Sequence, residues 1–68
     1  MRSFTAVIER YPGTGVYVGH IPGLAGARAQ GETLDRLNAN LIEAVSRILE
    51  DGEPAFATEF AGILIVRI

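Results

Sequence analysis

Residues 31–52 have the sequence GETLDRLNANLIEAVSRILEDG and predict the helix of the chain. Thr33 can accept a backbone hydrogen bond as the N-cap residue, and Gly52 is suited to the position just after the helix end. Between them, apolar side chains recur at spacings of three and four residues, which places them on one stripe: Leu34, Leu37, Leu41, Ala44, Val45, Ile48 and Leu49. This stripe predicts that one face of the helix packs on a sheet.

Three short strands are expected before the helix. The side chains of residues 3–11 alternate as in a strand, and YPGT at residues 11–14 favours a tight turn. Residues 16–20 are then the return strand of an antiparallel hairpin. The next six residues, IPGLAG, contain a proline and two glycines, which favour a loop. A third strand is expected at residues 27–30, between this loop and the helix.

A fourth strand is expected at residues 62–68. Its apolar side chains fall on both faces: Ile63 and Ile65 on one, and Leu64, Val66 and Ile68 on the other. The order β-β-β-α-β predicts an α+β fold with sheet order 3-2-1-4, in which the last strand pairs with the first and one helix packs on one face. Because the helix can cover only one face, we expect these five residues to form the interface of a homo-oligomer, either a dimer or a tetramer.

The length of the chain also favours self-association. Its 68 residues, 49% of them hydrophobic, are expected to form a single domain over residues 1–68. A chain of this size buries only about 60% of the surface that it exposes when unfolded, and its core rarely supplies more than ~3–5 kcal/mol. Small domains usually compensate with disulfides, a metal or self-association. Since the chain has no Cys and a single His, self-association is the expected solution.

The distribution of charges argues against direct nucleic-acid binding. The net charge is −2, and the six basic residues are arginines scattered singly, whereas phosphate contacts need clustered basic side chains. The longest apolar stretch is far shorter than the roughly 20 residues that span a bilayer, so no membrane segment is expected. The N-terminus also lacks the apolar run of a signal peptide. We therefore expect a cytoplasmic protein.

The sequence contains no clear constellation for catalysis, a metal or a cofactor. His20 has no Ser or Cys in a nucleophile context, and we expect it to face a partner or pack on a loop. The acidic residues lie mostly on or beside the solvent face of the predicted helix. The segment at residues 13–15 joins two strands, whereas a phosphate loop joins a strand to a helix. We therefore expect no enzyme, no metal ion and no cofactor.

A series of residues from the loop to the helix has a characteristic order and spacing: Pro22, Leu24, Gly26, Gly31, Thr33, Asn40, Glu43 and Ala44. Together with FTAVIE at residues 4–9, this pattern resembles the HicB-like antitoxin family over nearly the whole chain. Ala25 departs from the pattern, because the family usually has a second proline there. Many members continue into a C-terminal DNA-binding module, and the end of this sequence at Ile68 leads us to expect no direct operator binding.

The resemblance implies a partial ribonuclease-H-like fold and a protein that blocks a small, basic, mRNA-cleaving toxin called HicA. Ribonuclease-H-type catalysis would need several strand carboxylates to hold two metal ions, and only Glu9 is suitably placed. We therefore expect a non-enzymatic binding protein; the alternative is an oligomeric scaffold or small-ligand-binding domain without a toxin partner. The candidate toxin-binding residues lie on or near the predicted hairpin: Glu9, Tyr11, Tyr17 and His20.

Overall fold

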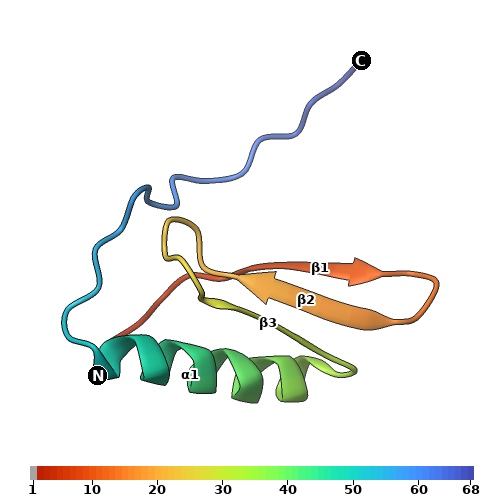
Figure 1. Cartoon of the computed structure of the whole chain (residues 1–68). Coiled ribbons are helices and arrows are strands. Elements are labelled where there is room, and N and C mark those ends of the chain that lie inside the picture. Colours follow the sequence, from red (N-terminus) through yellow and green to blue (C-terminus); the bar gives the residue numbers. More distant parts are fainter. Residues whose placement is uncertain (1) are drawn as a thin grey trace.

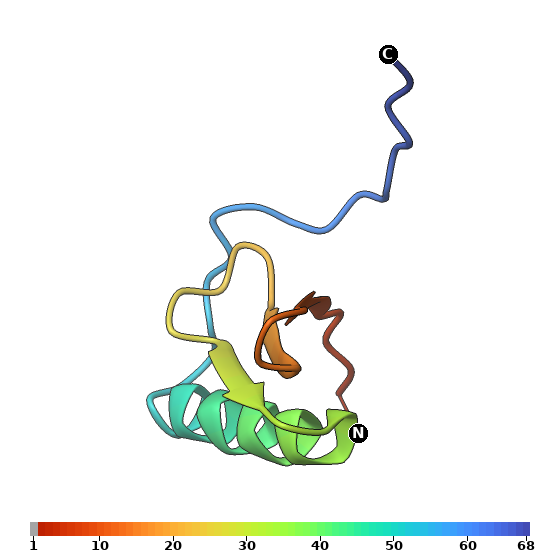
Figure 2. The same ribbon diagram turned by 90° about the vertical axis from the view of Figure 1, so that its right-hand side faces the viewer.

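A three-stranded antiparallel sheet and one helix form two layers (Figure 1). The structure is a computed structural model and describes residues 2–68. Strands β1 (Val7–Tyr11), β2 (Val16–His20) and β3 (Arg28–Gly31) pair in the order β1-β2-β3, and the helix α1 (Leu34–Glu50) follows them. The helix packs on β3 and β2 and leaves β1 at the uncovered side of the sheet, as the end-on view in Figure 2 shows. No helix among residues 2–68 is long and apolar enough to cross a membrane.

The predictions for the first three strands and for the helix are confirmed. The hairpin between β1 and β2 is antiparallel, and β2 has the predicted bounds. Strand β1 begins only at Val7, whereas alternation predicted a strand from residue 3, and β3 is shifted by one residue. At the start of the helix, Thr33 is extended and its hydroxyl oxygen accepts a hydrogen bond from the Arg36 N–H at 3.1 Å. The local signals therefore placed the cap correctly.

The predicted fourth strand at residues 62–68 is wrong for this structure. Within residues 51–68 no helix or strand forms, and the end of the chain leads away from the two layers (Figures 1 and 2). The sheet order 3-2-1-4 is therefore reduced to 3-2-1. The physical reason is that α1 packs on β2 and β3 and does not reach the region outside β1. A fourth strand there would still expose apolar side chains to water.

The core depends on a close approach between α1 and the sheet. Leu37, only 1% exposed, is the largest fully buried side chain. Gly19 on β2 leaves room for it, since a Cβ there would lie 3.3 Å from the Leu37 Cδ2 atom. Gly31 permits an even tighter contact, because a Cβ there would lie 2.6 Å from the Leu37 backbone nitrogen. A second buried cluster joins the loop before β3 to the helix and consists of Ile21, Leu24, Ala27 and Val45.

We predict that Leu37→Ala lowers the free energy of unfolding by about 2–5 kcal/mol, because it leaves a cavity between α1 and β2. Urea unfolding followed by circular dichroism measures this change. Glu43→Ala is the matched control on the solvent side of α1, where it removes only an exposed ion pair with Arg47. Its expected cost is below about 0.5 kcal/mol. Equal costs for the two variants would contradict the described core.

Candidate protein-binding surface

The most exposed apolar side chains are at the end of the chain. We call residues 62–68 the tail; its five aliphatic side chains, Ile63, Leu64, Ile65, Val66 and Ile68, are 80–121% exposed. In the structure, which describes all of this segment, no backbone hydrogen bond joins residues 58–68 to the rest of the chain. A continuous apolar segment of this kind marks a protein interaction site or an aggregation site. The predicted interface residues are therefore available for a partner.

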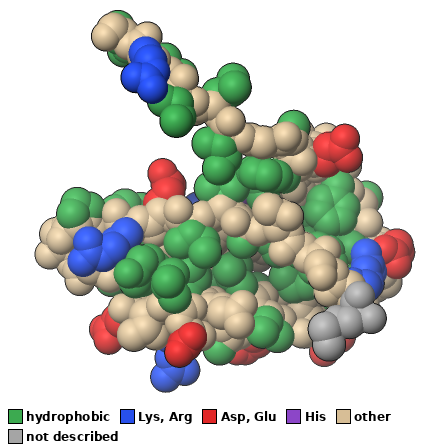
Figure 3. Space-filling model, turned by 180° about the vertical axis from the view of Figure 1, so that it is seen from behind, with side chains coloured by type: hydrophobic (Ala, Val, Ile, Leu, Met, Phe, Trp, Pro, Cys, Tyr) green, Lys and Arg blue, Asp and Glu red, His purple; other side chains and the backbone are tan. Residues whose placement is uncertain are grey.

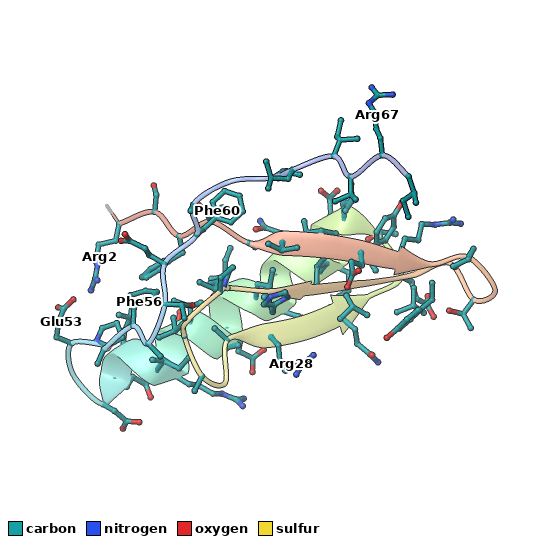
Figure 4. The ribbon with its side chains drawn as sticks, turned by 90° about the horizontal axis from the view of Figure 1, so that it is seen from above. Arg2, Arg28, Glu53, Phe56, Phe60 and Arg67 are labelled. Atoms are coloured by element: carbon teal, nitrogen blue, oxygen red, sulfur yellow. The ribbon has the colours of Figure 1, made fainter. Side chains whose placement is uncertain are left out.

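The segment before the tail is fixed to the body at three places. We call residues 51–61 the linker. Glu53 of the linker forms an ion pair with Arg2 at 2.7 Å, and the two side chains face each other in Figure 4. The Phe56 ring stacks on Phe4 with a centroid distance of 6.2 Å. The Ala57 N–H donates a hydrogen bond of 3.0 Å to the Gly23 carbonyl. The linker is therefore attached to the body as far as Ala57, and four residues separate this contact from the start of the tail.

An apolar groove lies between α1 and the segment that leads into β1. Its walls include Phe4 and Ala6 on one side and Leu41, Ile42 and Leu49 on the other. Ile42 is 58% exposed at this groove. Seen from behind, the molecule shows hydrophobic side chains gathered between the sheet and the helix, with the tail projecting above them (Figure 3). The groove continues the uncovered side of the sheet, because α1 does not reach β1.

The strand register separates the four predicted toxin-binding residues. Gly19 faces the helix, and its partner Ile8 shares that face. Alternation then places Glu9, Tyr11 and His20 together on the opposite face, which we call the open face. Tyr17 lies on the helix side, with the Arg10 guanidinium 6.0 Å from the centre of its ring. Three of the candidates therefore share a surface, and Tyr17 does not belong to it.

The open face combines polar and apolar groups. His20 lies directly opposite Arg28 on β3, and Glu9 is one diagonal position away from His20. Diagonal neighbours in a sheet are about 7–8 Å apart. Among residues 2–68, no three His, Cys, Asp or Glu side chains are grouped as metal ligands would be. Val16 and Val18, directly opposite Tyr11 and Glu9, are the apolar groups of this face, so it offers apolar contact as well as hydrogen bonding, charge pairing and ring contacts to another protein.

Sequence reasoning missed the groove. Ile42 is about 100° around the helix from Leu41 but only about 20° from Leu49, so it lies at the edge of the apolar stripe that predicted the packed face of the helix. Its side chain is one of few apolar groups on the helix outside that stripe. An isolated apolar residue beside a predicted stripe was the available signal, and it indicates that the apolar face is wider than the sheet contact.

Comparisons with known proteins place the chain in a family. A UPF0150 protein of Synechocystis sp. is 39% identical over 62 residues, which cover 91% of this chain and 88% of the relative. A UPF0150 protein of Thermotoga maritima is 32% identical over 66 residues, or 96% of this chain and 88% of that relative. The chain belongs to the UPF0150 family.

The UPF0150 family is related to the HicB-like antitoxins, which agrees with the resemblance of the sequence to that family. No family model matches this UPF0150 protein, and no solved structure matches it. The candidate protein-binding surface of this chain consists of three parts: the tail, the groove and the open face of the sheet.

We predict that Gly23→Ala releases the linker. Gly23 has φ +81°, and a Cβ there would lie 1.9 Å from the Thr58 carbonyl oxygen. The left-handed conformation alone costs about 1–2 kcal/mol with a side chain present. Hydrogen exchange should show faster exchange of the Ala57 amide, together with a lower Tm. Gly13→Ala, at a site with nothing within 4 Å, is the control; unchanged exchange at Ala57 in Gly23→Ala would contradict the anchor.

Proposed function

We propose that this UPF0150 protein is a non-enzymatic, oligomeric binding protein that blocks a small, basic, mRNA-cleaving toxin of the HicA type. The observation that carries the proposal is a monomer surface with an exposed apolar tail and an uncovered sheet side. The relation of UPF0150 proteins to HicB-like antitoxins supports the choice of partner. In this proposal the protein acts by covering the toxin's active site.

The tail supports the self-association part of the proposal. Full burial of one aliphatic side chain contributes about 1.5–3 kcal/mol, and the tail presents five of them. Association costs several kcal/mol in lost translational and rotational freedom. Burial of most of the tail can offset that cost, so a stable dimer or tetramer is compatible with these residues.

The open face supports the binding of a basic partner. Glu9 supplies a carboxylate, and Tyr11, 61% exposed, supplies a ring with a hydroxyl group at the edge of the same face. Tyrosines are enriched at protein interfaces because their rings contribute contact area at a small entropy cost. The net charge of −2 would also favour encounter with a basic protein. His20 extends this surface across the sheet, whereas Arg28 opposite it is a cation and adds no attraction for a basic partner.

We predict that Ile65→Glu or Leu64→Glu yields either a monomer or an insoluble chain, because a charge in an apolar contact costs several kcal/mol. Multi-angle light scattering at micromolar concentration measures the mass, and the wild type should exceed the 7.3 kDa of one chain. Arg67→Gln is the control within the tail and should keep the mass of the wild type. A monomeric wild type would refute self-association.

We predict that the protein forms a stable complex with a small basic protein encoded next to it and suppresses its RNase activity. Glu9→Arg combined with Tyr11→Ala should weaken this complex at least tenfold, or about 1.4 kcal/mol. Glu43→Arg, which makes the same charge change on the outer side of α1, should leave the affinity unchanged. Absence of binding at low salt would exclude the antitoxin role and favour an oligomeric scaffold or small-ligand-binding domain.

A further inference from the structure

We propose that the tail of one copy forms the fourth strand beside β1 of a second copy, where it extends the sheet next to the apolar groove between α1 and the segment that leads into β1. This inference rests on the self-association part of the proposed function and specifies how the copies are joined. The occupant is a segment of known composition, the Ile-, Leu- and Val-rich residues 62–68. In the single chain this segment is exposed, and within the described residues no strand pairs with the outer edge of β1.

The free edge of β1 provides the backbone for this exchange. β1 pairs with β2 on one side and has no strand on its other side in the described chain. Unpaired backbone groups along such an edge are a template for a further strand. β1 has five residues and the tail has seven, so at about 3.3 Å per residue the tail is long enough to pair with the whole of β1.

The side chains at this edge match an aliphatic strand. Ile8 of β1 is 48% exposed and points to the side of the sheet on which the groove lies. Ile42 of α1 is more than half exposed at the groove. A strand outside β1 places alternate side chains on the side of the sheet that faces α1. One alternate set of the tail contains Leu64, Val66 and Ile68, and the other contains Ile63 and Ile65 followed by Arg67. Whichever register is adopted, aliphatic side chains of one set therefore face the side of the sheet on which the groove lies.

The second set explains why the strand comes from another copy. In one chain, nothing would cover the side of the new strand that faces away from α1. Two or three aliphatic side chains, depending on which alternate set faces that side, would stay in water. Between two copies, the exchanged strands bring the bodies together and that side can be buried at their contact. The linker also directs the tail away from the helix layer after Gly62, which has φ +151° (Figures 1 and 2). Exchange of an identical element is a known route to dimers.

Cysteine cross-linking tests the exchange directly, because the natural chain has no cysteine. We would prepare Ile8→Cys and Ile65→Cys as single variants, mix the two unfolded chains and refold them together. The mixture is then treated with a short bis-maleimide reagent. A cross-linked product that contains one chain of each variant, at twice the chain mass, is expected. Ile65→Cys mixed with Glu43→Cys, on the outer side of α1, is the matched control and should give little of this product.

Three results would overturn the exchange. The first is a cross-link within one chain of the double variant Ile8→Cys with Ile65→Cys, which would show that the tail folds back on its own β1. Ile65→Cys alone would cross-link to itself preferentially if two tails pair with each other. A dimer that shows none of these cross-links would place the tail elsewhere. Arg10→Cys with Arg67→Cys, both at exposed positions and on the same strand faces as Ile8 and Ile65, replaces the first pair if that pair does not fold.

Light scattering on the same samples separates this inference from the proposed function. A monomer would contradict self-association itself, and with it the exchange. A dimer or tetramer without the cross-link between copies would contradict only the exchange. If the monomer binds the toxin, the antitoxin role would stand, and the tail would be expected to contact the toxin in place of a second copy.

Discussion

The contact of Leu37 with Gly19 and Gly31 determines where the helix lies, and the rest of the molecule depends on it. Two glycines let α1 approach β2 and β3 closely enough to bury this leucine almost completely. The same contact centres the helix under two of the three strands and leaves the β1 side without cover. A single helix cannot cover the apolar surface of a sheet with a fourth strand, so part of that surface is left for another chain.

Two apolar surfaces remain as a consequence, and they are complementary. One is concave, the groove between α1 and the segment that leads into β1, and the other is an extended tail. Because the core within one chain is small, burial of the tail against a partner would add to the free energy of unfolding as well as to affinity. Stability and association are therefore coupled in our account. The open face lies on the other side of the sheet from the groove and carries Glu9, Tyr11 and His20.

Local signals in the sequence were sufficient for the hairpin and the helix, because the turn, the N-cap and the apolar spacing each act within a few residues. They were not sufficient for the tail. Alternation describes the conformation that suits a segment, but it does not say whether the strand edge that pairs with it belongs to the same chain. Position along the hairpin predicts that Tyr17 and Glu9 belong to one site, but the parity of the strand register sets them on opposite faces. The groove was missed because Ile42 lies beside the stripe that packs on the sheet.

Hydrogen exchange of the tail amides at a series of protein concentrations tests the central claim, that the tail is a strand supplied to another copy. Our account predicts that the amides within residues 63–68 are protected at high concentration, and that protection is lost on dilution as the copies separate. Rapid exchange of these amides at every concentration would contradict it, and so would protection that persists unchanged in a monomer.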